Sequence, residues 1–177
     1  MKTIETEFLQ TVIKRFRAAQ ELAEKTFAQL ADADFFFQPN KARNSIAVTI
    51  QHMSGNMLSR WTHFLTEDGE KDWRNRDAEF EVHTLNREQM LYIWNKGWDC
   101  LYNALTSLQE GDLQKSILIR GEALSVIDAI HRQLSHYSYH VGQIVYLGRF
   151  IKDQEWQSLS IPKGQSEIYN KKMKPKH

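Results

Sequence analysis

The sequence predicts an all-α protein built as a four-helix bundle, and three observations support this fold class. Apolar residues recur at three- and four-residue steps over four long stretches, the spacing that places them on one face of an α-helix. Only 8 Gly and 3 Pro occur among 177 residues, which disfavours a sheet-rich fold with many tight turns. The chain is 41% hydrophobic, enough for the core of a single globular domain, which we expect to span residues 1–177.

The first helix is expected from about Thr3 to Leu30. The loop after it contains three consecutive phenylalanines, 35–37, which we expect to cap one end of the core or to line the mouth of a pocket. The second helix is expected to begin at Asn44-Ser45, where small polar side chains provide an N-cap, and to continue to about Leu65.

Residues 66–84 are polar and interrupt the helical pattern. A polar segment of this length inside a compact domain is either disordered or functional. Its Arg74 and Arg76, together with Arg60 of the second helix, are expected to form ion pairs with the nearby carboxylates of Asp68, Glu70, Asp77 and Glu79. The alternative is that these guanidinium groups bind a carboxylate or phosphate of a substrate.

The third helix has a well-marked start, because Asn86 and Gln89 have the spacing of a capping box. It is expected to stop near Gly111, and residues 116–122 have the extended character of a short strand. The fourth helix is expected from Ser125 to about Lys152, with one apolar stripe facing the interior of the bundle. The long connections mean that a simple up-down-up-down order is not required.

Charge and cysteine content limit the function classes. Lys and Arg number 23 against 22 Asp and Glu, so no overall field would recruit nucleic acid or an acidic membrane. The single Cys100 has no partner for an internal disulfide, and we expect it to pack rather than to act as a nucleophile. Without a recognisable leader or a long apolar run, the chain is expected to be soluble and cytoplasmic.

The fourth helix carries two histidines, His136 and His140, four residues apart. An α-helix places such a pair one above the other, so that both imidazoles can bind one metal ion. The general base of the H-E-x-x-H proteases is absent, because Tyr137 follows the first histidine. The pair is therefore half a metal site, or, as the alternative, two polar residues flanking the core.

A third ligand must come from elsewhere in the chain. His131 falls on the opposite side of the fourth helix, and His83 and His177 lie in a loop and a tail. The rigidly placed options are therefore His52 and His63 on the second helix. Periodicity places His52 on the outer face of that helix, which argues against a buried ligand, although small neighbours would leave an open cleft beside it. Spacing alone favours His52 only weakly over His63.

Several motifs together resemble the DinB/YfiT-like superfamily of proposed metalloenzymes, and more narrowly one of its uncharacterised branches. They are Gln51-His52 with Asn56 and Arg60-Trp61, the loop residues 68–71 and 74–77, His136-Tyr-Ser-Tyr-His140 with Gln143, and the closing segment 160–166. The resemblance covers nearly the whole chain. It implies a four-helix bundle with long crossover connections in up-down-down-up order, commonly a homodimer, and a divalent metal bound by His52, His136 and His140.

The resemblance also implies a range of metals and reactions. Relatives bind nickel or zinc, and others iron or manganese. Characterised relatives transfer low-molecular-weight thiols such as bacillithiol, or are mycothiol-dependent isomerases. A three-histidine site leaves a coordination position open, so that a water or thiol is activated at neutral pH. We therefore expect a metal-dependent S-transferase or hydrolase acting on a small molecule, with no nucleic-acid or membrane partner.

Supporting roles at this site are predicted for three polar residues. Gln143 and Asn56 each lie about one turn beyond a histidine and are placed to orient a ligand or a bound water. Arg60 is a candidate for gripping an anionic substrate group. Two alternatives to an enzyme remain: a metal-containing binding or stress-response protein without turnover, and a dimeric bundle whose histidines hold metal only incidentally.

Overall fold

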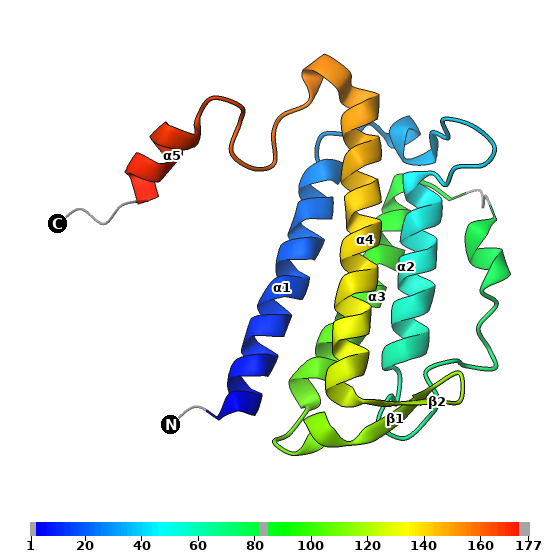
Figure 1. Cartoon of the computed structure of the whole chain (residues 1–177). Helices are drawn as coiled ribbons and strands as arrows, with labels where there is room; N and C mark the ends of the chain where they lie inside the picture. Colours follow the sequence, from blue (N-terminus) through cyan, green and yellow to red (C-terminus); the bar gives the residue numbers. More distant parts are fainter. Residues whose placement is uncertain (1–2, 82–84, 174–177) are drawn as a thin grey trace.

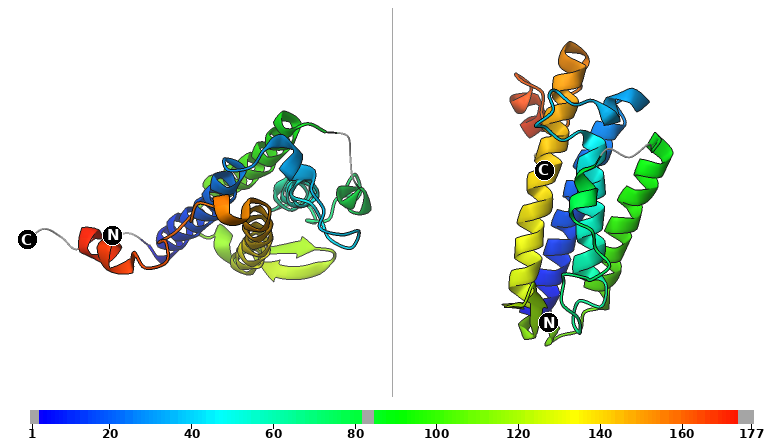
Figure 2. Two further views of the ribbon diagram at one scale, coloured as in Figure 1. Left: turned by 90° about the horizontal axis from the view of Figure 1, so that it is seen from above. Right: turned by 90° about the vertical axis from the view of Figure 1, so that its right-hand side faces the viewer.

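The computed structural model describes residues 3–81 and 85–173, and within them the protein is predominantly helical with one small sheet. Four long helices lie side by side (Figure 1): α1 (Ile4–Phe27), α2 (Ile46–Trp61), α3 (Arg87–Ser107) and α4 (Val126–Lys152). Helices α1 and α4 run in one direction and α2 and α3 in the other, and Figure 2 shows the same arrangement from two further sides. None of the described helices combines the length and apolar character needed to cross a membrane.

All four long helices begin with a side-chain N-cap. Thr3, Ser45 and Ser125 each accept a hydrogen bond from a backbone N–H of the first turn, and Asn86 forms the predicted capping box with Gln89. These caps satisfy N–H groups that have no partner within the helix. Because capping is local in sequence, the predicted helix starts at residues 45, 86 and 125 are confirmed.

The predicted end of the second helix is wrong, because α2 stops at Trp61 instead of Leu65. Thr62 closes the helix in an extended conformation, and His63 has a positive φ of 49°. This left-handed conformation is uncommon for a residue other than glycine and does not continue a right-handed helix. His63 therefore lies in the turn beyond α2 and not on the rigid helix where the sequence placed it.

Helix α2 is the central element of the fold. Thirteen of its 16 residues are buried, because it packs against α3, against α4 and against the segment of residues 66–81, which we call the covering segment. The covering segment contains the short 3-10 helix η2 (Asp77–Phe80). It lies across the face of α2 that periodicity assigned to solvent.

The core between the helices is rich in aromatic side chains. Tyr137 of α4 is completely buried and lies close to Phe16 of α1 and Trp98 of α3. Its hydroxyl accepts a hydrogen bond from Trp61 Nε1 and donates one to Asn56 Oδ1, each 3.1 Å long. Of the three loop phenylalanines, Phe35 in the 3-10 helix η1 (Asp32–Phe36) is buried in the core, whereas Phe37 is 41% exposed.

A β-hairpin joins α3 to α4. The 3-10 helix η3 (Asp112–Gln114) leads into strands β1 (Ser116–Ile119) and β2 (Glu122–Ser125), which pair antiparallel. The prediction of extended structure is confirmed for β1, but the return strand was missed. Arg120 and Gly121 form the turn with positive φ values of 57° and 74°, as tight hairpin turns require. Asp68 of the covering segment accepts hydrogen bonds from both of their backbone N–H groups, each 2.7 Å long.

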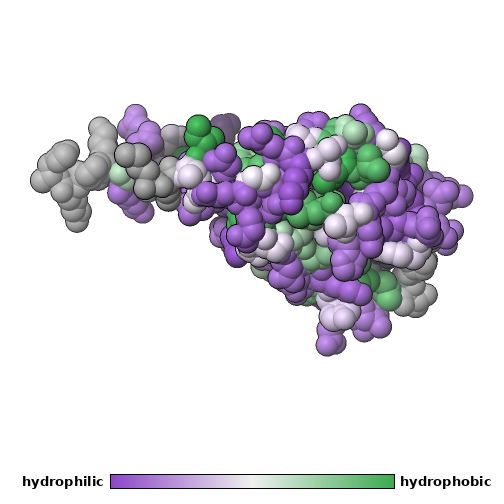
Figure 3. Space-filling model, turned by 90° about the horizontal axis from the view of Figure 1, so that it is seen from below, coloured by the Kyte–Doolittle hydropathy of each residue, from purple (hydrophilic) through white to green (hydrophobic). Residues whose placement is uncertain are grey.

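The C-terminal segment leaves the bundle after α4, and the sequence did not predict its helix. It passes through the 3-10 helix η4 (Asp153–Glu155) and ends in α5 (Ser166–Met173), every residue of which is exposed. Figures 1 and 2 show α5 standing away from the four long helices. In Figure 3 it projects from a body whose visible face is mainly hydrophilic with hydrophobic patches.

Candidate metal site

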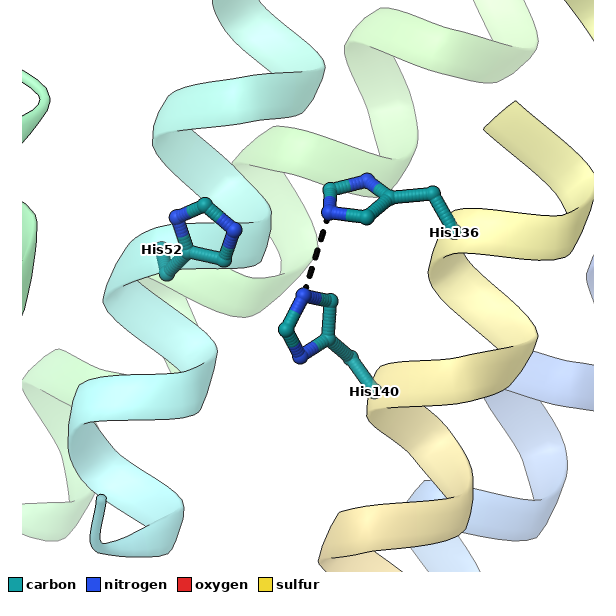
Figure 4. Close-up of side chains that lie close together, drawn as sticks. All are labelled: His52, His136 and His140. Carbon is teal, nitrogen blue, oxygen red and sulfur yellow. Dashed lines mark hydrogen bonds between the residues drawn. The ribbon is translucent and has the colours of Figure 1, made fainter. Parts of the chain in front are cut away.

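Three histidines from two helices meet in one place. His52 comes from α2, and His136 and His140 come from α4 (Figure 4). One ring nitrogen from each lies within 4.8 Å of the other two. The Nε2 atoms of His136 and His140 are 3.1 Å apart, and the His52 and His140 ring centroids are 4.9 Å apart. The structure therefore brings together the three residues that the family resemblance implied as ligands.

His52 is buried, with only 5% of its surface exposed, so the solvent exposure that periodicity predicted for its face of α2 is wrong. The covering segment explains the difference. Phe80 lies against the imidazole with ring centroids 4.7 Å apart, and the Glu79 carboxylate contacts its Nδ1. Periodicity within α2 contains no information about a separate segment that folds over it. His136 and His140 are half-buried, so the cluster is more open on the α4 side.

The donor set suits one divalent ion: the three nitrogens lie within 4.8 Å of one another, and one pair has nearly the spacing of bound ligands. A tetrahedral zinc site with Zn–N bonds of about 2.0–2.1 Å sets its nitrogens about 3.3 Å apart, close to the 3.1 Å between His136 and His140. The Nδ1 atoms of two rings are already engaged: that of His52 with Glu79 Oε2 and that of His140 with Gln143 Oε1, both at 2.9 Å. Such contacts leave Nε2 as the ligand atom and fix the orientation of the ring.

Electrostatics keep the α4 pair neutral in the absence of an ion. Burial lowers the pKa of His136 to about 3, and the neighbouring His140 and His52 reinforce the shift. Burial also lowers the pKa of His140, although the contact with Gln143 opposes it. Metal ligation requires the unprotonated imidazole nitrogen. Both rings are therefore held in the protonation state that binds an ion.

The covering segment is fixed by an ion-pair network, as the sequence predicted. Arg74 donates to both carboxylate oxygens of Glu79, at 2.7 and 2.9 Å. Arg60 donates to the Gly69 carbonyl and to Glu70, which also pairs with Arg120. Burial opposes ionisation of Glu79, but the hydrogen bonds from His52 and Arg74 outweigh it and hold the pKa of that carboxyl below its usual value.

The sequence did not single out Glu79 as a partner of a metal-ligand candidate. In the sequence it was one acidic residue among several in a polar stretch. The available signal was the length of that stretch, since a long polar segment in a compact domain is often functional. Nothing in the sequence alone identifies which of its carboxylates reaches His52.

Of the three polar residues predicted to support the site, only Gln143 contacts one of the clustered histidines. Gln143 contacts His140, whereas Asn56 accepts from the buried Tyr137 hydroxyl and Arg60 belongs to the ion-pair network. His131 is exposed and its ring contacts Phe8 of α1, away from the cluster, as predicted. His63 lies beyond the end of α2, and residues 83 and 177 lie outside the described part of the chain.

Two surface hollows among the described residues are lined by residues other than the three histidines. One, of about 740 Å³, lies between the end of α2 and α3 and is lined by Thr62, Phe64 and Cys100. Burial raises the pKa of the half-buried Cys100 thiol. Another, of about 660 Å³, lies between the start of α2 and α4 and includes Thr49 and Gln143. Gln143 therefore faces this hollow while it contacts His140.

Comparisons with known proteins define the fold and the family. The chain is similar to the crystal structure of a conserved protein from Enterococcus faecalis, with a TM-score of 0.60 and 16% sequence identity over 85% of this chain and 98% of that one. At this identity the similarity shows the fold alone. No curated protein matches the chain. The family model described as "Protein of unknown function (DUF1572)" matches residues 3–165. The chain therefore belongs to the DUF1572 family.

Proposed function

We propose that this protein is a metal-dependent enzyme in which His52, His136 and His140 bind one divalent cation. The observation that carries the proposal is the convergence of three imidazole nitrogens within 4.8 Å of one another. Neutral imidazoles suit zinc, nickel and iron, whereas magnesium and calcium prefer oxygen ligands. We favour zinc or nickel, with iron or manganese as the other options.

Three neutral ligands favour a catalytic site over a structural one. Structural zinc sites are closed by four protein ligands, whereas catalytic sites keep a position for water or substrate. When bound, the ion would act as a Lewis acid that lowers the pKa of a water or thiol. The chain's own part is to present the nitrogens: Glu79 and Gln143 hold two of the rings by Nδ1.

The reaction class that we propose is transfer of a low-molecular-weight thiol to an electrophilic carbon, or hydrolysis of a small substrate. We also place the bundle in the DinB/YfiT-like group with up-down-down-up order, commonly homodimeric. Support comes from the shared direction of α1 and α4, opposite to α2 and α3, and from ligands on α2 and α4. Because one fold supports many reactions, the fold supports the site more strongly than the substrate.

Metal analysis tests the site. Protein purified without a histidine tag is expected to contain about one equivalent of divalent metal per chain by plasma mass spectrometry, and His136→Ala is expected to lose it. His131→Ala is the matched control, since His131 lies on the same helix but contacts Phe8 and not the cluster. Metal-free wild-type protein that takes up no zinc, nickel, iron or manganese would refute the proposal.

Turnover tests the enzyme. The metal-loaded protein is assayed with monobromobimane or chlorodinitrobenzene and cysteine-type thiols, and separately with small esters. Activity that is present in wild type and lost in His136→Ala supports catalysis. Stoichiometric metal with no turnover of either substrate class would instead favour the metal-containing binding protein.

A further inference from the structure

We propose that Glu79 is a positioning residue for the metal site, holding His52 with its Nδ1 protonated and its Nε2 directed at the other two histidines. This inference rests on the proposed function, because it concerns the same three ligands. It adds a residue from the covering segment to which the sequence motifs gave no role at the metal site. Through Glu79, the covering segment contributes a residue to the metal site.

The contact has the geometry of a carboxylate–imidazole hydrogen bond. Glu79 Oε2 is 2.9 Å from His52 Nδ1, and both side chains are largely buried, at 9% and 6% exposure. A carboxylate only accepts, so Nδ1 must carry the proton, and in the neutral imidazole Nε2 then keeps its lone pair. Carboxylates at the second nitrogen of a ligating histidine fix its tautomer and raise its basicity.

Glu79 is itself held in place, which distinguishes it from a mobile surface carboxylate. Arg74, whose side chain is 2% exposed, donates from Nε to Oε1 and from Nη2 to Oε2. This two-point contact fixes the plane of the carboxylate. The same Oε2 atom therefore receives one hydrogen bond from Arg74 and one from His52.

Gly55 supplies the space that this arrangement needs. A Cβ atom at position 55 would lie 2.7 Å from the Glu79 Cδ atom, closer than such atoms approach in proteins. Position 55 lies in α2, one turn from His52, and its φ is not positive, so the backbone conformation does not require glycine there. The absence of a side chain lets the carboxylate lie directly against α2.

Zinc affinity tests the role of Glu79. Metal-free wild type and Glu79→Gln are titrated with Zn²⁺ against a competing chelator, and we expect the variant to bind about 10- to 100-fold more weakly. Glu70→Gln is the matched control, because Glu70 belongs to the same ion-pair network but is not a hydrogen-bond partner of His52; it pairs with Arg60 and Arg120 and, at 3.6 Å, with Arg74. It is expected to bind as wild type does.

Gly55→Ala is a second, independent perturbation that retains the carboxylate. It is expected to displace Glu79 and to weaken Zn²⁺ binding in the same direction. Gly142→Ala is its control: Gly142 lies on α4 only two residues beyond His140, yet a Cβ there would meet no atom within 4 Å. Circular dichroism confirms that each variant is folded before it is titrated.

Nitrogen NMR provides a readout that a purely structural role would not move. In metal-free protein labelled with ¹⁵N-histidine at pH 8, the His52 ring is expected to carry its proton on Nδ1, with its signals assigned by their absence from His52→Gln. In Glu79→Gln the form protonated on Nε2 is expected to appear, because an amide donates as well as accepts. Glu70→Gln should leave the wild-type tautomer.

The outcomes separate this inference from the proposed function. Equal Zn²⁺ affinity in wild type and Glu79→Gln overturns it, and so does an equal loss in Glu70→Gln, which would show only that the network stabilises the fold. If wild type binds no metal, the proposed function fails. The NMR measurement then still decides whether Glu79 orients His52, and an unchanged tautomer in Glu79→Gln overturns that as well.

Discussion

Replacing Tyr137 by phenylalanine is the sharpest test of how the core beside the histidines is held together. The ring is completely buried, and its hydroxyl links Trp61 Nε1 to Asn56 Oδ1 by two hydrogen bonds of 3.1 Å. Tyr137→Phe keeps the ring and removes one oxygen atom. It leaves a buried donor on Trp61 and a buried acceptor on Asn56 without this partner.

The magnitude follows from those two groups. An unsatisfied buried polar group costs about 1–3 kcal/mol, so the two together predict a loss of about 2–6 kcal/mol in the free energy of unfolding. This is a large share of the roughly 5–15 kcal/mol that stabilises a typical domain. Tyr102→Phe is the matched control: its hydroxyl donates a single bond to Gln20 in a half-buried place, for which about 0.5–1.5 kcal/mol is expected.

The assay is equilibrium unfolding in urea, followed by circular dichroism on metal-free protein so that ligand binding does not contribute. The unfolding slope should stay constant between variants, since both substitutions preserve the buried area. A loss of less than 1 kcal/mol for Tyr137→Phe, or one no larger than for Tyr102→Phe, would refute the reasoning. The double variant Tyr137→Phe with Trp61→Phe should lose less than the sum of the single losses, because it no longer leaves the indole N–H buried alone.

Three further predictions concern the metal, the hairpin and the thiol. Zn²⁺ at 100 times its dissociation constant should stabilise wild type by about 2.7 kcal/mol in thermal melts, and a chelator should reverse the stabilisation. A similar gain in His136→Ala would contradict binding at the three histidines. Asp68→Asn should cost about 1–3 kcal/mol in urea unfolding, because a charged acceptor for the hairpin turn is lost. Burial opposes ionisation of Asp68, but the backbone N–H donors outweigh it and hold the pKa of its carboxyl below the usual value. This contribution is therefore present above the ordinary pKa and is lost as pH falls through the lowered one. A wild-type advantage that does not shrink as the pH falls below the ordinary range of an Asp carboxyl would be inconsistent with this cause. Burial raises the pKa of Cys100, so its thiolate fraction at pH 8 lies below that of free cysteine. Iodoacetamide should therefore alkylate Cys100 more slowly, and the rate should still rise at a pH where the rate for free cysteine has levelled off. Labelling as fast as free cysteine would contradict this, because it would show that the thiol is accessible and ionised.

The parts of the fold that were predictable are those determined within a few residues of sequence. Ser45, Asn86 and Ser125 mark helix starts because an N-cap contacts backbone only two or three residues away. The spacing of His136 and His140 likewise fixes their relation within one helix. Each of these predictions depends on local geometry, and each agrees with the structure.

The parts that could not be predicted depend on how distant segments pack. The burial of His52 results from the covering segment, whose contact with α2 has no periodic signature. The return strand β2 was missed because four residues of mixed polarity, 122–125, give little alternation by themselves. Helix α2 ends early because His63 adopts a left-handed conformation, which residue type alone does not indicate.

The hydrogen bonds of Asp68 have a consequence for how two connections between the helices can vary. One connection follows α2 and the other precedes α4, and Asp68 bonds the first directly to the hairpin turn of the second. Glu70 pairs both with Arg120 of that turn and with Arg74, and Arg74 in turn pairs with Glu79. The two connections are therefore held to each other by these hydrogen bonds and ion pairs. An insertion that lengthened the hairpin would loosen both at once, so these loops are expected to change length together and not separately.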